Sequence, residues 1–187
     1  MQLYLFDIPT EISTERTHLR RLREGDGPAI HRLVQSNRHQ LSNYFPTTVP
    51  ATSDPQKAEE FVLERLAHWL LQEEYTLVVQ PLGQERVCGM VRVFRIDWRV
   101  PAAEVGYFLD EGQSGQGWMT EILQAVADYA AEHLRMKRLT LRISPDNLAS
   151  QRVAIKCGFE QEGILRSSFR QGDGRLIDAL VFGRVFD

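Results

Sequence analysis

The segment that most restricts how this chain can fold is a glycine-rich stretch between two apolar regions. Residues 103–109 are typical of a buried strand, and residues 118–134 have the apolar spacing of a helix packed on a sheet. The connecting residues 112–117 hold three glycines, Gly112, Gly115 and Gly117. A strand, a glycine loop and a helix in this order predict an α/β arrangement.

This loop is also a candidate anion site. The N-terminus of a helix leaves about four N–H groups unpaired and carries roughly half a positive charge. Glycines let the backbone adopt positive φ and approach a ligand closely. Phosphate is the usual ligand of such a site, whereas a turn that only connects two elements is the alternative.

Known phosphate motifs fit this loop unequally. A P-loop is excluded, because no lysine follows the glycines. A dinucleotide fingerprint fits Gly115 and Gly117, with Thr120 in place of its third glycine. The next strand supplies no acidic residue for a ribose, so nicotinamide binding stays an alternative only. Ser114 is not a nucleophile elbow, because Gln116 replaces the required glycine.

The rest of the chain mixes helices and strands. Asp54 is the expected N-cap of a helix that starts at Pro55, and Gly158 has the position of a left-handed C-cap. Residues 37–54 contain two prolines and five Ser/Thr residues and are expected to form a loop. We expect helices from residues near 26, 55, 118 and 146, and strands at residues 17–22, 75–80, 87–96, 103–109, 139–143, 159–169 and 176–186.

Composition sets outer limits. The 187 residues, 43% of them hydrophobic and 25% charged, fit one domain spanning residues 1–187. A net charge of −3 does not favour nucleic acid as a partner. No apolar run reaches the roughly 20 residues of a membrane helix, so no membrane partner is expected. Residues 1–9 are apolar but lack the basic start and cleavage site of a signal peptide.

Cysteine and histidine usage points to an intracellular protein without a metal. Cys88 and Cys157 stand far apart and form no paired motif, and the five histidines show no ligand spacing. We therefore expect two reduced thiols, a cytoplasmic location and no metal cofactor.

Two motifs resemble the cofactor signatures of the GNAT N-acetyltransferases. Residues 115–121 (GQGWMTE) resemble the acetyl-CoA pyrophosphate loop with its first helical turn. Residues 146–163 resemble the second signature, Asn-x-x-Ser…Lys-x-Gly-Phe…Glu-Gly. The serine in it is typical of the branch that acetylates ribosomal-protein N-termini at serine or alanine. Residues 103–107 and 9–22 resemble the fourth and first strands of that branch.

The resemblance implies both a fold and a reaction. The fold would be an α/β (α+β) single domain, with a mixed, mostly antiparallel sheet of about seven strands flanked by about four helices. The reaction would move an acetyl group from acetyl-CoA to a primary amine by direct attack in a ternary complex. A protein N-terminal α-amine, as in ribosomal proteins, is the first acceptor choice. Its pKa of about 7.7–8.0, against about 10.4 for lysine, makes a weak, water-relayed base sufficient.

The resemblance also implies the site residues. Glu104 would be the base and Ser150 the proton donor to the departing thiolate, while backbone N–H groups at a strand bulge near Phe108 and Leu109 would polarise the carbonyl. Two of these residues have a structural alternative. Glu104 could be a structural carboxylate that pairs with a neighbouring strand, and Asn147 could be only the N-cap of a helix. Cofactor contacts would come from Phe108, Leu109, Gly115, Gln116, Gly117, Trp118, Met119, Asn147 and Ser150.

Some alternatives remain open. Many members place a tyrosine where this chain has Ala154, and Met119 is bulky at a position usually kept small. Both differences from the family pattern would be consistent with a protein that binds acyl-CoA as a sensor without catalysing a reaction. A small-molecule amine or antibiotic acetyltransferase would share the chemistry with another acceptor. The acceptor walls would be residues 37–54 and the turn at residues 171–175, and an exposed sheet edge would suit a homodimer.

Overall fold

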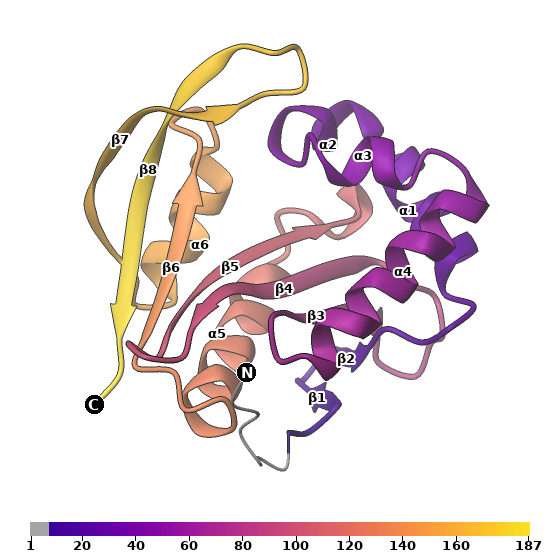
Figure 1. The fold of residues 1–187 in the computed structure, drawn as a ribbon, viewed down its shortest axis with the longest axis horizontal. Coiled ribbons are helices and arrows are strands. Elements are labelled where there is room, and N and C mark those ends of the chain that lie inside the picture. Colours follow the sequence, from indigo (N-terminus) through magenta and orange to yellow (C-terminus); the bar gives the residue numbers. More distant parts are fainter. Residues whose placement is uncertain (1–7) are drawn as a thin grey trace.

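In the computed structural model, which describes residues 8–187, one sheet runs through the molecule (Figure 1). Its eight strands lie in the order β1-β2-β3-β4-β5-β6-β8-β7. All neighbours pair antiparallel except β5 and β6, which are parallel. The strands are β1 (Glu11–Ser13), β2 (Thr17–Arg21), β3 (Tyr75–Pro81), β4 (Gly89–Asp97), β5 (Ala102–Leu109), β6 (Arg138–Ile143), β7 (Glu160–Arg170) and β8 (Leu176–Val185).

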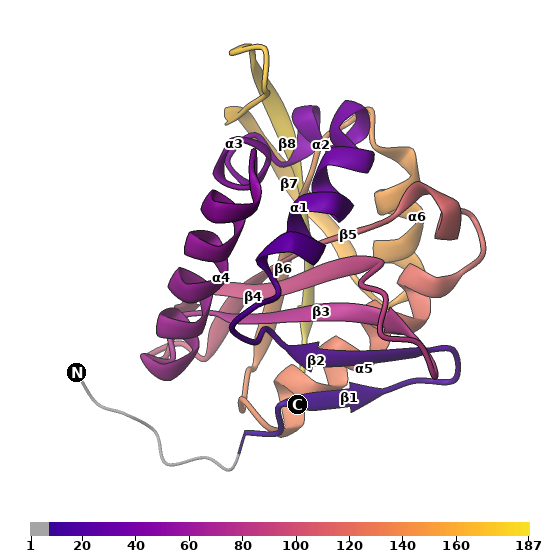
Figure 2. The same cartoon turned by 90° about the vertical axis from the view of Figure 1, so that its right-hand side faces the viewer.

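Helices lie on both sides of this sheet (Figures 1 and 2). Successive residues of a strand point to opposite faces, so β3 sends Leu77 and Val79 to the core under the longest C-terminal helix and Val78 to the core under the N-terminal helices. The helices of the described chain are α1 (Gly27–Ser36), α2 (Arg38–Tyr44), α3 (Thr48–Ala51), α4 (Pro55–Leu70), α5 (Trp118–Glu132) and α6 (Leu148–Lys156).

The expected fold class is confirmed, with more elements than predicted. Within residues 8–187 the sheet has eight strands rather than about seven, and the chain forms six α-helices rather than about four. The extra strand, β1, is only three residues long, so its one apolar residue between two polar residues is too short a pattern to predict a strand. No helix in residues 8–187 is long and apolar enough to cross a membrane. The signal-peptide assessment concerns residues 1–7, which lie outside the described residues, together with Ile8 and Pro9.

The prediction of a loop at residues 37–54 is wrong, because this segment contains the helices α2 and α3. Pro50 lies in the first turn of α3, where the missing N–H of proline costs nothing. Leu41 and Val49 are buried in the core under the N-terminal helices, and Thr52 donates its hydroxyl to the Thr48 carbonyl at 3.0 Å. Burial of these few side chains outweighs the turn-forming composition.

Local predictions elsewhere are confirmed. Asp54 accepts a hydrogen bond from the Lys57 N–H at 2.9 Å and caps α4, which starts at Pro55. Gly158 has φ +75° at the end of α6. Cys88 and Cys157 are both free and buried.

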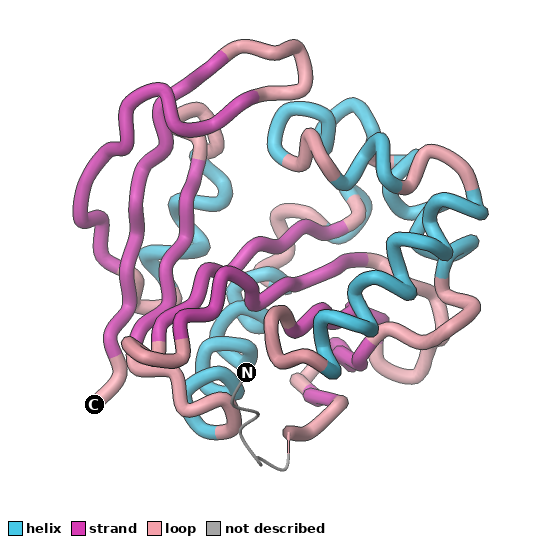
Figure 3. Tube along the Cα trace, in the orientation of Figure 1, coloured by secondary structure: helices cyan, strands magenta, loops and turns pink. Residues whose placement is uncertain are grey.

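The parallel pair in the sheet is short and then opens. Only residues 102–104 of β5 pair with residues 138–140 of β6. Beyond this point β6 leaves with β8 and β7 as a separate arm, whereas β5 stays beside β4 (Figure 3). A gap therefore opens in the sheet at the C-terminal end of β5.

The N-terminal helices are held together at a backbone-to-backbone contact. Glu59 of α4 accepts hydrogen bonds from the N–H groups of Gly25 at 2.7 Å and Gly27 at 2.8 Å. A Cβ on Gly27 would lie 2.6 Å from the Glu59 nitrogen and 2.7 Å from its Cα. We expect Gly27→Ala to lower the free energy of unfolding by about 1–3 kcal/mol in urea denaturation, because the two helices must separate.

Gly163→Ala is the matched control, because a Cβ there meets nothing within 4 Å and the strand is exposed. Its free energy of unfolding should change by less than about 0.5 kcal/mol. Equal stability of both variants would contradict the close helix contact.

Candidate active site

The gap in the sheet leads into a cavity of about 350 Å³. Its walls come from α2, the end of β5, the glycine loop, the first turn of α5 and the length of α6. Phe45 of α2 packs edge-on against Phe108 of β5, with ring centroids 5.1 Å apart. Segments far apart in the sequence thus enclose one space.

The glycine loop presents backbone donors to this cavity. Gly115 has φ +75° and Gly117 has φ +81°, conformations that favour glycine. Gly117 is the N-cap residue of α5, and no side chain caps that helix. The positive end of α5 is therefore open toward the cavity, as an anion site requires.

Arg16, in the turn between β1 and β2, braces this loop. Its Nη1 donates to the Gln116 carbonyl at 2.9 Å, and its Nε donates to the Glu121 carboxylate at 2.8 Å. Its guanidinium carbon lies 5.8 Å from the centre of the Trp118 ring. The backbone N–H of Arg16 also donates to Glu121 at 2.9 Å. One arginine therefore fixes both the loop and the first turn of α5.

Other polar groups of the cavity lack partners within the protein or carry positive charge. Gln113 Oε1 is buried and accepts no hydrogen bond in the described structure. Arg152 and Lys156 of α6 line the cavity. Within residues 8–187, no three His, Cys, Asp or Glu side chains are grouped to hold a metal ion. The donor set suits an extended anionic ligand.

A pair of hydroxyl groups lies at the base of the cavity. Tyr107 of β5 places its hydroxyl oxygen 2.8 Å from Ser150 Oγ in the first turn of α6. Asn147 accepts a hydrogen bond from the Ser150 N–H at 3.1 Å and caps this helix. Burial raises the pKa of the Tyr107 hydroxyl above its ordinary value, so it stays protonated. Sequence reasoning missed Tyr107 as a functional residue, although it stands in the motif that includes Glu104.

Glu104 lies at the last paired position of β5 and β6, and it does not line the cavity. Its Oε2 accepts a hydrogen bond from Arg95 at 2.6 Å, and its Oε1 accepts one from Arg142 Nε at 2.5 Å. Burial raises the pKa of this carboxyl, and the Arg95 charge opposes that rise. Glu104 therefore has a structural role in linking β4, β5 and β6.

The bulge expected near Phe108 and Leu109 is absent, because β5 pairs with β4 without interruption over residues 104–109. The irregularity lies instead between Phe94 and Asp97. The Asp110 N–H donates to the Cys88 carbonyl at 2.7 Å, which continues the pairing of β5 with β4. Backbone N–H groups alternate in direction along a strand, so those of the even-numbered residues of β5 face β4. By the same alternation, the N–H of Leu109 faces the gap and that of Phe108 does not.

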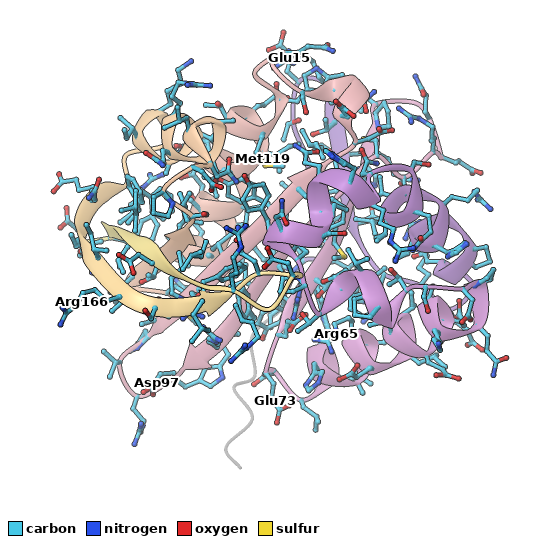
Figure 4. All side chains as sticks on the ribbon, turned by 90° about the horizontal axis from the view of Figure 1, so that it is seen from above. Glu15, Arg65, Glu73, Asp97, Met119 and Arg166 are labelled. Carbon is cyan, nitrogen blue, oxygen red and sulfur yellow. The ribbon has the colours of Figure 1, made fainter. Side chains whose placement is uncertain are left out.

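The structure gathers most of the expected site residues. Gln116 is an exception, since its side chain turns back to donate to the Gly112 carbonyl at 2.9 Å. Met119 lies near the middle of the molecule, whereas Arg166 on β7 points outward (Figure 4). Eight of the residues line the cavity: Phe108, Leu109, Gly115, Gly117, Trp118, Met119, Asn147 and Ser150.

The two expected acceptor walls meet each other. The turn between β7 and β8 reaches α2 (Figure 1), and a Cβ on Gly172 would collide with the Ser42 carbonyl. Gln171 is buried beside this contact. Through this contact, α2 and the β7–β8 turn bridge the two sides of the gap between β5 and β6.

Comparison with known proteins identifies the family. Residues 16–160, more than half of the chain, match the family described as "Acetyltransferase (GNAT) domain". The chain belongs to this family. It is an acyltransferase related to a ribosomal-protein-serine acetyltransferase.

Individual relatives support the assignment. The ribosomal-protein-serine acetyltransferase of Escherichia coli (strain K12) is 26% identical over 176 residues, which cover 93% of this chain and 95% of the relative. The probable N-acetyltransferase YjcK of Bacillus subtilis (strain 168) is 38% identical over 99 residues, only 52% of this chain and 55% of that protein.

A solved structure that is similar to this chain contains coenzyme A. A ribosomal L7/L12 α-N-protein acetyltransferase in complex with coenzyme A has a TM-score of 0.87 to this chain and is 25% identical. The match covers 96% of this chain and 98% of that structure.

The brace made by Arg16 can be tested without any ligand. In Arg16→Ala, amide hydrogen exchange of residues 115–118 should accelerate by about tenfold, because the loop loses the hydrogen bond to the Gln116 carbonyl and the first turn of α5 loses the one to Glu121. Arg99→Ala is the control, since Arg99 forms an exposed ion pair with Asp97 at 3.0 Å. Unchanged exchange at residues 115–118 in the Arg16 variant would refute the brace.

Proposed function

We propose that this enzyme transfers the acetyl group of acetyl-CoA to a protein N-terminal α-amine. The observation that carries the proposal is the cavity at the gap in the sheet, which is lined both by the open N-terminus of α5 and by the Tyr107–Ser150 pair. Two of the relatives described above are named for acetylation of ribosomal proteins, which supports this choice of acceptor.

The residues present fit coenzyme A. The N–H groups after Gly115 and Gly117 suit the pyrophosphate, and Arg152 and Lys156 suit further phosphate charge. The unpartnered Gln113 Oε1 suits an amide or amino donor of the ligand. Asn147, Trp118 and Met119 complete the walls.

Acetyl-CoA supplies an acetyl group activated as a thioester. In the transfer, a C–N bond forms, the C–S bond breaks, the amine loses one proton and the sulfur gains one. The Leu109 N–H polarises the carbonyl from the gap side of β5. Ser150 gives a proton to the sulfur, and Glu104 takes the amine proton through water.

A free α-amine is the acceptor that suits the base available in this structure. The contact between Gly172 and Ser42 joins the two expected acceptor walls. An α-amine also has about one-tenth of its population neutral at pH 7, so a carboxylate already engaged by Arg95 and Arg142 is a sufficient base.

The decisive test combines binding with acceptor choice. Calorimetric titration should show micromolar binding of acetyl-CoA and CoA and none of NADH. Peptides beginning with Ser or Ala should then be acetylated, while the same peptides with a blocked N-terminus and an internal lysine should not. Turnover of polyamines or aminoglycosides alone would favour a small-molecule acetyltransferase. Binding without any turnover would favour the sensor.

The base role of Glu104 predicts a pH dependence. Burial raises the pKa of this carboxyl, and a base must be ionised, so kcat should rise with pH through that elevated pKa and then level off. Glu104→Gln should lower kcat by about 100-fold and remove this limb of the profile, while the Kd for CoA stays unchanged.

Glu11→Gln is the matched control, because Glu11 also pairs with an arginine, Arg23, at 3.0 Å on the distant edge of the sheet. Thermal unfolding of both variants separates activity from folding. If Glu104→Gln melts at a lower temperature but keeps its kcat and its pH profile, Glu104 is structural only.

A further inference from the structure

The Tyr107 hydroxyl has no role in the acetyl transfer described above. Its ring belongs to the residues packed against the core under α5, and its hydroxyl reaches the cavity wall. There it lies 2.8 Å from Ser150 Oγ and 3.4 Å from the Ser150 carbonyl. Among the described residues these are the polar contacts of this hydroxyl.

The direction of the hydrogen bond follows from acidity. A phenol, with a pKa near 10, is a far stronger acid than an aliphatic alcohol, so Tyr107 is the better donor and Ser150 Oγ the better acceptor. Ser150 Oγ has no other hydrogen-bond partner among the described residues, so with Tyr107 as the donor the hydroxyl proton of Ser150 is uncommitted. That proton is free to point into the cavity.

The surroundings of Ser150 suit a developing negative charge. Ser150 lies in the first turn of α6, near the positive end of its macrodipole. A hydrogen bond received from Tyr107 also makes the Ser150 hydroxyl a stronger donor. Both effects act on a group that lines the same cavity as the glycine loop.

We propose that Tyr107 is a positioning residue, which holds the Ser150 hydroxyl so that its proton faces the sulfur of the departing thiolate. The proposal rests on the acetyl transfer proposed above. In the step, Ser150 gives its proton to sulfur and regains one from cavity water, while the amine proton passes through water to Glu104. One proton thus passes from nitrogen to sulfur overall, and Tyr107 keeps its own.

The first test is a double-mutant cycle. Tyr107→Phe and Ser150→Ala should each lower kcat by about 10- to 100-fold with little change in the KM for acetyl-CoA. The double variant should lose no more than either single variant, because both remove the same donor. Additive losses would overturn the proposal.

Tyr129→Phe is the matched control. Tyr129 is also a buried tyrosine with a 2.8 Å hydrogen bond, to the Pro9 carbonyl, but it lies away from the cavity. Its loss should leave kcat unchanged, and its melting temperature shows what removal of a buried tyrosine hydroxyl costs in stability.

A second test separates positioning from structure. With S-acetyl-4-nitrothiophenol as donor, the leaving thiol is acidic and needs no proton, so Tyr107→Phe and Ser150→Ala should match the parent in kcat/KM. Equal losses with this donor and with acetyl-CoA would indicate a structural role and overturn the proposal.

A binding measurement needs no turnover. The ultraviolet absorbance of the CoA thiolate, titrated with pH, should show a lower thiol pKa in the complex than in free CoA, because Ser150 donates to the thiolate. Tyr107→Phe should reduce this shift, and an unchanged shift would overturn the proposal. Failure of the acetyl transfer itself is distinguishable, since the parent enzyme would then acetylate no amine.

Discussion

The short pairing of β5 with β6 is the constraint on which the site depends. Three residues of each strand are paired, and the two strands then part. The chain leaves β5 through the glycine loop into α5, and it leaves β6 through Asn147 into α6. Both helix N-termini are therefore brought to the rim of the same gap by connectivity alone. Backbone donors of β5 that β6 no longer pairs, such as that of Leu109, face the same space.

Glu104 marks the point where the strands part, and it ties them together there. Arg95 reaches it from β4 and Arg142 from β6, so one carboxylate joins three strands across the end of the parallel pair. A charge buried in such a place is stable only when paired. Burial raises the pKa of this carboxyl, and the Arg95 charge opposes that rise.

The sequence predicts the order of most elements from local signals, whereas most of the expected cavity residues come from the resemblance to the GNAT N-acetyltransferases. Gly115, Gly117 and Asn147 are recognisable from turn and capping chemistry, whatever lies around them. The helices at residues 37–54 are missed because their stability comes from burying Leu41 and Val49, not from propensity. The bulge is missed for a related reason, since strand pairing is a long-range property. Tyr107 and Ser150 are 43 residues apart, and only the fold brings their hydroxyls together.

The hydroxyl pair also explains how this chain does without a tyrosine at position 154. Ala154 is fully buried in the core under α5 and does not line the cavity, so α6 offers no room there for a large polar side chain. The phenol comes instead from β5, on the opposite side of the gap. It approaches Ser150 from the sheet, which leaves the cavity side of Oγ clear. A donor divided between a strand and a helix is thus sensitive to the width of the gap, and that width is set by the three strands that Glu104 ties together.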